Sequence, residues 1–348
     1  MDKKNLKIIA SLLVLVILIG VYIFGKQNKK EDVSATYYYL GTVNDIKILK
    51  DNKKHSEEIL KKSEKILIDV HNKMSSQLSN TEVDKVNKNA GIKPVKVSEE
   101  TFYVMENALK YAGLTEGVFD PSIGAISSLW NIGNEEARVP KNEEIKDNLK
   151  FVNYKNVLLN KKQNTIFLKE KGMKIDLGAI AKGYAADRIA NLMKDEKISS
   201  AIINLGGNVY VVGKKDDSNF KIGIQAPYEK KSEAIGYIKG SDISVVTSGT
   251  YERYIKDGDK IYHHMMDPKT GYPFDNNLNS VSIISKVSMD GDALSTSTYG
   301  LGIEKGKKFI ENQKNIEAIF VTKDKKIILT KGLKNNFVLT DDTYEIIK

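Results

Sequence analysis

The chain has 348 residues, of which 41% are hydrophobic and 28% charged, so we expect a soluble globular body of one large domain or two small ones. Its lack of cysteine excludes disulfides, thiolate metal sites, a cysteine nucleophile and a lipid-modified N-terminal cysteine. The net charge of +9 comes almost entirely from lysine, because the only arginines are Arg138, Arg188 and Arg253. Proteins that recognise bases rely on arginine, so we expect a solvated lysine-rich surface and no nucleic-acid partner.

The N-terminus has the pattern of a membrane anchor. Three lysines within residues 3–7 precede an uncharged apolar run over residues 8–24, which spans about 25 Å as a helix, enough for a bilayer core. Val33 and Ala35 resemble a cleavage site, but a charged stretch separates them from the apolar run. We therefore predict an uncleaved anchor; the alternative for this run is a buried core helix.

These features divide the chain into three parts. We predict a single-pass anchor over residues 1–25, a polar linker over residues 26–35 and a catalytic domain over residues 36–348. Lysines flank the apolar run on both sides, so charge alone sets its orientation only weakly. The expected location is the cell membrane, with the domain outside the cytoplasm.

Strands and helices are mixed in the remaining sequence. We expect a first strand over Tyr37–Val43, an amphipathic helix over His55–Met74 and a second helix capped by Ser98. Further helices are predicted at 179–193, near 292–302 and near 305–313. Short strands are predicted at 156–159, 165–168, 201–204, 209–212, 220–225, 234–239, 243–247, 281–286, 317–322 and 326–330. The irregular order favours an α+β fold over a doubly wound sheet.

Two segments combine glycine with acidic or basic side chains. In residues 117–124, Phe119 offers a stacking face and Asp120 a carboxylate within a turn, although a turn alone would explain the pattern. In residues 175–187, a strand ends at Asp176 and small residues open a helix. Backbone amides at such a junction bind phosphate, and Lys182 would neutralise it. The alternative is tight strand–helix packing. A Gly-Gly turn within residues 204–208 could be an ordinary hairpin.

The later segments add a histidine and a pair of oxygen ligands. Within residues 262–273, His264 stands near Asp267 and could be a general base or part of an orienting pair. Asp292 and Thr296 are four residues apart, so on a helix they share one face. A carboxylate and a hydroxyl are hard ligands suited to Mg²⁺ holding a phosphate. The alternative is a helix cap and a packing residue.

In this order, the segments resemble the ApbE-type FAD:protein FMN transferases. The resemblance runs from about Tyr38 to about Gly302, and residues 175–187, 262–273 and 290–296 are its specific parts. It implies a single α+β domain of the T-fold-like kind that binds FAD, with Mg²⁺ on the pyrophosphate. It also implies that a Thr or Ser hydroxyl of a partner attacks the phosphorus nearer riboflavin, so that AMP leaves and FMN stays on the partner.

The resemblance also implies roles for individual residues. His264 and Asp292 are the catalytic candidates, with His264 in a catalytic or orienting role. The metal ligands would be the backbone carbonyl of Ala179 and the side chains of Asp292 and Thr296. The implied FAD-site residues are Leu40 at the flavin end, Val118, Phe119, Asp120, Asp176, Lys182 and, through its backbone, Met266.

Some positions depart from the family pattern. Leu40 replaces a common methionine, Thr250 replaces an acidic or amide residue, and Gln77 replaces a common aromatic residue after Met74-Ser75. A lost stacking partner at Gln77 leaves open FAD hydrolysis to FMN and AMP. The alternatives to transfer are therefore a metal-dependent FAD pyrophosphatase and a membrane-tethered flavin-binding protein without turnover. The expected partners are FMN-accepting subunits of membrane or extracellular electron-transfer systems.

Overall fold

A computed structural model describes residues 12–15, 30–227 and 233–347. Within these ranges, no helix is both long and apolar enough to cross a membrane. Apart from residues 12–15, the predicted anchor lies outside the described residues. Those four residues are helical, and their side chains, Leu12, Leu13, Val14 and Leu15, are each between 53% and 58% exposed.

The described chain begins with a long β-hairpin of β1 (Lys30–Tyr39) and β2 (Thr42–Asn52). Residues 30–35 belong to β1, so the predicted linker over residues 26–35 was wrong for these six positions. The reason is a period of two, in which exposed residues alternate with residues that pack inward, including Val33 and Ala35. The strand predicted over Tyr37–Val43 is also corrected, because Leu40 and Gly41 form the hairpin turn, both with positive φ.

This hairpin forms one edge of a nine-stranded sheet. The other strands are β6 (Ser200–Leu205), β7 (Asn208–Gly213), β10 (Ile243–Gly249), β13 (Leu278–Ser285), β14 (Glu317–Thr322), β15 (Lys326–Leu329) and β17 (Glu345–Ile347). Their order is β1-β2-β6-β7-β10-β13-β14-β15-β17, and β17 joins β15 as a parallel neighbour. The strand predicted over 317–322 is confirmed at both ends, and most others are confirmed within a few residues.

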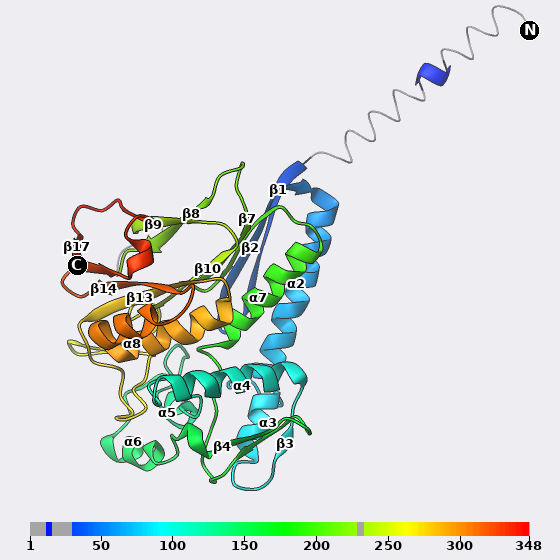
Figure 1. The fold of residues 1–348 in the computed structure, drawn as a ribbon. Helices are drawn as coiled ribbons and strands as arrows, with labels where there is room; N and C mark the ends of the chain where they lie inside the picture. Colours follow the sequence, from blue (N-terminus) through cyan, green and yellow to red (C-terminus); the bar gives the residue numbers. More distant parts are fainter. Residues whose placement is uncertain (1–11, 16–29, 228–232, 348) are drawn as a thin grey trace, which may run out of the picture.

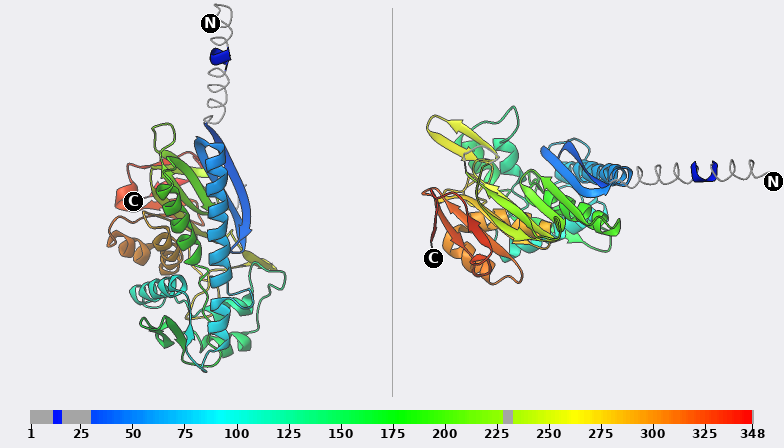
Figure 2. Two further views of the ribbon diagram at one scale, coloured as in Figure 1. Left: turned by 90° about the vertical axis from the view of Figure 1, so that its right-hand side faces the viewer. Right: turned by 90° about the horizontal axis from the view of Figure 1, so that it is seen from above.

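Three helices cover one face of the sheet: α2 (Lys53–Met74), α7 (Ala181–Asp195) and α8 (Ser288–Glu311) (Figures 1 and 2). The opposite face carries a small sheet of β8 (Phe220–Gln225), β9 (Ala234–Gly240) and β16 (Phe337–Leu339). Neighbouring residues Ile283 and Ile284 of β13 belong to different apolar clusters because consecutive strand residues point to opposite faces. The sheet therefore lies between two hydrophobic layers.

The remaining elements lie at one end of the helical layer (Figure 1). They are α3 (Glu82–Lys88), α4 (Glu99–Leu114), α5 (Gly124–Trp130), α6 (Asn142–Leu149) and a sheet of β3 (Val95–Lys96), β5 (Thr165–Leu168) and β4 (Val157–Asn160). A separate hairpin of β11 (Tyr254–Asp257) and β12 (Lys260–His263) packs against the apolar cluster around Trp130. Two short 3₁₀ helices cover Tyr154–Asn156 and Lys331–Leu333. The predicted α+β class is confirmed.

Local sequence signals explain where the main helices begin. The side chain of Asn52 accepts a hydrogen bond from the amide of His55 at the start of α2, and Ser98 caps α4 as predicted.

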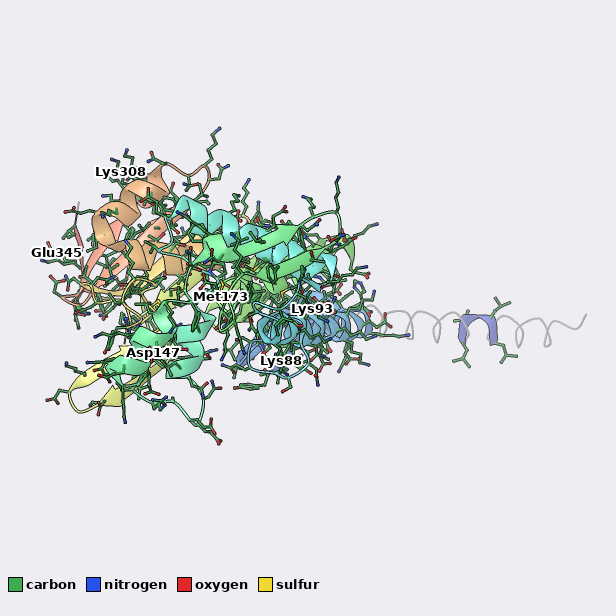
Figure 3. The ribbon with its side chains drawn as sticks, turned by 90° about the horizontal axis from the view of Figure 1, so that it is seen from below. Lys88, Lys93, Asp147, Met173, Lys308 and Glu345 are labelled. Atoms are coloured by element: carbon green, nitrogen blue, oxygen red, sulfur yellow. The ribbon has the colours of Figure 1, made fainter. Side chains whose placement is uncertain are left out.

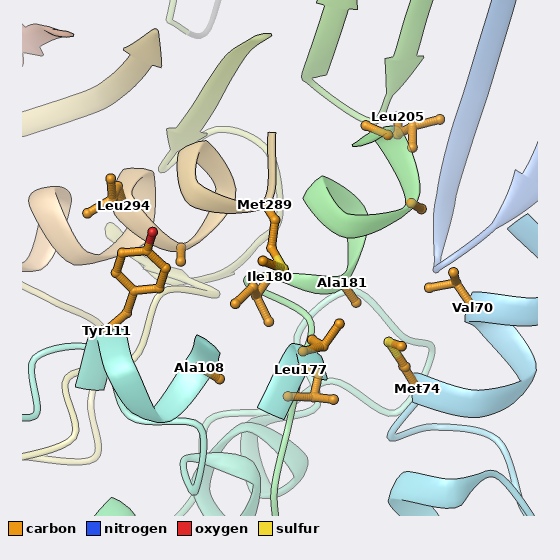
Figure 4. Close-up of a cluster of buried hydrophobic side chains, with 14 of the residues drawn as sticks. Val70, Met74, Ala108, Tyr111, Leu177, Ile180, Ala181, Leu205, Met289 and Leu294 are labelled. Carbon is orange, nitrogen blue, oxygen red and sulfur yellow. The ribbon is translucent and has the colours of Figure 1, made fainter. Parts of the chain in front are cut away.

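The two helices predicted near 292–302 and 305–313 form one element, α8, interrupted by the non-helical Gly302. Figure 4 shows the buried ends of α2, α4, α7 and α8 meeting around Ile180 and Met289.

Lysines are spread over the surface of this fold. Lys88 and Lys93 are exposed close to one another near α3, and Lys308 is exposed on α8 in another part of the molecule, whereas Met173 is buried (Figure 3).

Candidate active site

The first part of the site is the junction before α7. The carboxylate of Asp176 accepts hydrogen bonds from the amide of Gly178 at 2.9 Å and from Ser127 Oγ at 2.8 Å. The amide of Asp176 donates to the carbonyl of Pro121 at 2.8 Å. The structure therefore joins the two glycine-containing segments, 117–124 and 175–187, at the N-terminus of a helix.

Asp292 of α8 faces this junction and is 3% exposed. Its Oδ2 accepts a hydrogen bond from the amide of Gly183 at 2.9 Å, and its Oδ1 lies 3.2 Å from Lys182 Nζ. A side chain at Gly183 would place its Cβ 2.4 Å from the carbonyl oxygen of Ser288. The close approach of α7 and α8 that brings Asp292 to Lys182 therefore requires glycine at position 183.

The bond from Gly183 has a consequence for Ala179. In a regular helix the amide of Gly183 would donate to the carbonyl of Ala179, four residues earlier. Because that amide donates to Asp292, none of the hydrogen bonds found among the described residues uses the Ala179 carbonyl oxygen. The carbonyl oxygen of Ala179 is thus available to bind a cation, and it lies close to the Asp292 carboxylate.

Asp292 and Thr296 lie on the same helix, as predicted. The Thr296 hydroxyl is 3.3 Å from Ser248 Oγ of β10, which also lies 2.8 Å from Ser295 Oγ. No group of three or more His, Cys, Asp or Glu side chains that could hold a metal occurs in the described part of the chain. The predicted donor set contains a single carboxylate, with a hydroxyl and a backbone carbonyl. It suits a cation such as Mg²⁺ that takes its remaining ligands from phosphate and water.

The start of α8 is fixed by Asp187, which the sequence did not identify as a functional residue. Its carboxylate accepts hydrogen bonds from the amides of Ser288 and Met289 at 2.7 and 2.8 Å. Burial raises the pKa of Asp187 to about 6, against the opposing effect of these two amides. Asp187 therefore positions α8, and with it Asp292, relative to α7.

The predicted FAD-site residues 118–120 lie in tightly packed surroundings. Asp120 accepts hydrogen bonds from the backbone of Ser122 and Tyr154, and burial raises the pKa of its carboxyl. The ring of Phe119 is 5% exposed within the main core, so it does not offer the open stacking face expected from the sequence. Val118 lies against α8 at Gly300.

The hairpin turn of Leu40 is connected to His264 through one arginine. The amide of Leu40 donates to His71 Nδ1 at 3.3 Å, and Arg253 donates to the carbonyl of Gly41 at 2.7 Å. The backbone carbonyl of Arg253 in turn accepts from the amide of His264 at 3.1 Å. Arg253 was missed as a functional residue, although it is one of only three arginines and closes the 247–253 segment.

His264 does not form the predicted pair with Asp267. Among the contacts of the described residues, the Asp267 carboxylate accepts hydrogen bonds from Lys269 and Thr270, while His264 Nδ1 lies 3.3 Å from the Arg253 carbonyl. Burial, followed by the charge of Arg253, lowers the pKa of His264 to about 3. The ring is therefore neutral at physiological pH.

Met266 is held against α5. Its side chain packs with Ile126 and Trp130, and its backbone pairs with Pro273. Trp130 Nε1 donates to the carbonyl of Gly271 at 2.8 Å, which fixes the 262–273 segment to the same helix. These contacts link segments 117–124, 175–187, 247–253, 262–273 and 290–296 into one region. Among the predicted site residues, Lys182 and Asp292 form an ion pair.

Comparisons with known proteins agree with this arrangement. The model of the ApbE family matches residues 40–320. The FAD:protein FMN transferase of Klebsiella pneumoniae is 39% identical over 77% of this chain and 83% of its own length, and that of Treponema pallidum is 30% identical over 93% and 94%. The crystal structure of the ApbE protein from Thermotoga maritima is 32% identical, with a TM-score of 0.80 over 87% of this chain and 98% of that one.

A flavin transferase ApbE from Vibrio cholerae has a similar structure, with a TM-score of 0.78, 26% identity and coverage of 88% of this chain and 99% of that one. Sequence, fold and the linked segments agree, and the chain belongs to the ApbE family of FAD:protein FMN transferases.

Proposed function

We propose that this enzyme transfers FMN from FAD to a Thr or Ser hydroxyl of a partner flavoprotein in a Mg²⁺-dependent reaction. The hydroxyl oxygen forms a bond to the phosphorus nearer riboflavin as the bond from that phosphorus to the bridging oxygen breaks. AMP leaves, the hydroxyl loses its proton, and FMN remains on the partner through a phosphodiester.

The observation that carries this proposal is the set of oxygen donors between α7 and α8. The Asp292 carboxylate, the Thr296 hydroxyl and the Ala179 carbonyl, whose usual helical donor is diverted, would hold Mg²⁺. When bound, the ion would neutralise charge on the pyrophosphate. Phosphoryl transfer needs alignment and charge neutralisation more than a protein nucleophile, which agrees with the absence of cysteine.

The surrounding residues supply binding and orientation. The amides at the N-terminus of α7 and the ammonium of Lys182 favour an anionic pyrophosphate. Leu40, Val118, Asp176 and Met266 would make the remaining contacts to FAD, whereas the side chains of Phe119 and Asp120 are buried beneath this surface. His264 acts as an orienting residue, because a ring with a pKa of about 3 is a weak general base at neutral pH.

A second candidate activity is hydrolysis of FAD to FMN and AMP. Gln77 is exposed in the loop after α2, where the family commonly has an aromatic residue, so this position lacks a stacking ring. Water would then reach the phosphorus more easily and compete with the acceptor hydroxyl. A flavin-binding protein without turnover is disfavoured, because binding alone does not require the Asp292 and Thr296 donors.

The location is part of the same proposal. Residues 1–25 would anchor the chain in the cell membrane, with the catalytic domain outside the cytoplasm. The exposed apolar side chains of residues 12–15 support this because leaving them in water is unfavourable. The acceptors would then be flavoprotein subunits of membrane or extracellular electron-transfer systems.

One incubation separates the three activities. The purified full-length chain in detergent is mixed with FAD, Mg²⁺ and an acceptor subunit, alongside an acceptor whose modified Thr is changed to Val. Flavin fluorescence that stays on the denatured acceptor, with one AMP per flavin and none on the Val acceptor, supports transfer. Free FMN without labelled acceptor indicates a pyrophosphatase, and unchanged FAD indicates a binding protein. Omitting Mg²⁺ tests the metal requirement.

A further inference from the structure

Lys182 sits where a cation bound by Asp292 would be expected. Its ammonium is 3.2 and 3.4 Å from the two carboxylate oxygens of Asp292 and 2.9 Å from the carbonyl oxygen of Gly178. The three neighbours are hard oxygen atoms, the type of ligand that a divalent cation takes in proteins. The ammonium of Lys182 is thus paired with the same carboxylate that the proposed metal site requires.

The position of Lys182 in its helix is electrostatically unfavourable. It lies in the first turn of α7, where the helix dipole repels cations. The side chain is nonetheless only 21% exposed, and that of Asp292 is 5% exposed. Because water screens such a pair weakly, the attraction to Asp292 is what offsets the dipole and keeps the ammonium in place.

We propose that Lys182 is a place-holder cation, which occupies Asp292 until metal and FAD bind together. This inference rests on the proposed function. A divalent ion on Asp292 would repel the ammonium, so metal binding must release Lys182 from the carboxylate. The released side chain then has the pyrophosphate of FAD as its nearest new anionic partner. Metal alone would bind weakly, and FAD would strengthen metal binding.

Asp292 itself need not move during this exchange. Its Oδ2 also accepts the hydrogen bond from the Gly183 amide, and that bond does not involve Lys182. The carboxylate therefore stays oriented when the ammonium leaves. Because coupling between two ligands is reciprocal, metal must strengthen FAD binding by the same factor as FAD strengthens metal binding.

The test measures metal binding without FAD, so it does not depend on activity. Mn²⁺ is titrated into the full-length chain, and free Mn²⁺ is followed by electron paramagnetic resonance. Lys182→Met should bind Mn²⁺ about tenfold more tightly than the parent chain, within the range typical of coupled sites. Lys182→Arg keeps the positive charge and should bind Mn²⁺ as weakly as the parent chain.

Two further variants serve as controls. Lys174→Met removes a lysine that lies 3.3 Å from Ser128 Oγ and does not contact Asp292, and its Mn²⁺ affinity should be unchanged. Asp292→Asn should lose Mn²⁺ binding altogether. Circular dichroism melting verifies that each variant is folded, and Lys182→Gln removes the same charge and should bind Mn²⁺ more tightly in its place if Lys182→Met is unstable.

The outcomes distinguish this inference from the proposed function. If Asp292→Asn abolishes binding but Lys182→Met binds Mn²⁺ no better than the parent chain, the metal site stands and the place-holder role is wrong. If Asp292→Asn binds Mn²⁺ normally, the metal site itself is wrong and both ideas are overturned. The inference further requires that saturating FAD raises the Mn²⁺ affinity of the parent chain at least fivefold, and that of Lys182→Met by a smaller factor.

Discussion

The proposed chemistry depends most on the carboxylate of Asp292. Asp292→Asn keeps the size of the side chain but removes the charge that would hold the cation. We expect transfer to fall by at least about two orders of magnitude, the scale of losing a major electrostatic stabiliser. Metal-free FAD binding should change less, because the flavin and adenine contacts lie elsewhere. Transfer is measured as covalent flavin fluorescence on the acceptor.

Asp195→Asn provides the matched control, because Asp195 is an exposed carboxylate at the far end of α7. It should transfer FMN at the parental rate. If Asp292→Asn does so too, with unchanged metal dependence, Asp292 is not a ligand. Excess Mg²⁺ or Mn²⁺ should restore part of the rate if the defect is one of metal affinity.

Gln77 is the residue expected to control the balance between transfer and hydrolysis. Gln77→Tyr restores an aromatic ring in the loop after α2 and should stack on the flavin, which limits access of water to the phosphorus. We expect free FMN to decrease several-fold relative to FMN on the acceptor. Both products are quantified by chromatography in one reaction. An unchanged ratio would show that this position does not control partitioning.

The low pKa of His264 predicts how transfer depends on pH. A ring with a pKa of about 3 remains neutral from pH 5 to 9, so its ionisation should not appear in the pH–rate profile over this range. His264→Asn retains a donor near the Arg253 carbonyl and should lose no more than about tenfold in rate, with an unchanged profile. Loss of a general base would cost about 10²- to 10⁴-fold and remove one limb of the profile.

Individual residues also show how far the sequence is informative. The shared face of Asp292 and Thr296 follows from helical periodicity alone, because both lie in the part of α8 that precedes the interruption at Gly302. The hydrogen bond between Arg253 and Gly41 joins positions 212 residues apart and depends on the tertiary fold. The missing His264–Asp267 pair shows that closeness in sequence does not ensure contact when a turn directs the two side chains to different partners.

At the scale of elements, the close packing of α7 and α8 determines the geometry of the site. Gly183→Ala would place a Cβ 2.4 Å from the Ser288 carbonyl and push the two helices apart. We expect the free energy of unfolding to fall by about 1–3 kcal/mol, as for other overpacked cores, and transfer to fall as the Gly183 amide moves from Asp292. Urea unfolding measures the stability change.

Gly113→Ala is the corresponding control for that prediction. Gly113 lies in α4, and a Cβ added there meets no atom within 4 Å. Replacing a helical glycine by alanine in open space should leave stability unchanged or raise it by up to about 1 kcal/mol. Equal stability of the two variants would argue against a tight approach of α7 to α8.

The elements that the sequence predicted well have strong local signals, such as the caps of α2 and α4 and the alternating strands of the central sheet. Short elements were missed, including α5, α6 and the β11–β12 hairpin. Their apolar residues pack mainly with one another around Trp130, in a small cluster assembled from distant segments. The first residues of β1 are charged and were interpreted as a linker. They form a strand nonetheless, because only every second residue packs inward.

At the scale of the whole molecule, the site depends on contacts that no local pattern contains. In the sheet, β10 lies between β7 and β13, and its residue Ser248 contacts Thr296. Arg253 follows the same strand and donates a hydrogen bond to the turn between β1 and β2. The α+β class could be predicted from the mixture of elements. The strand order could not, because it is determined by pairings between residues far apart in the chain.

The predicted topology concerns the whole chain and can be tested in intact cells. The basic residues before the apolar run favour an N-terminus inside the cytoplasm, so the catalytic domain should lie outside. Protease added to intact protoplasts should then digest the domain while a cytoplasmic marker survives. A variant lacking residues 1–25 should remain inside and be protected, which controls for entry of the protease into the protoplasts. Protection of the full-length domain in intact protoplasts, together with digestion after lysis, would place it in the cytoplasm and overturn the proposed location.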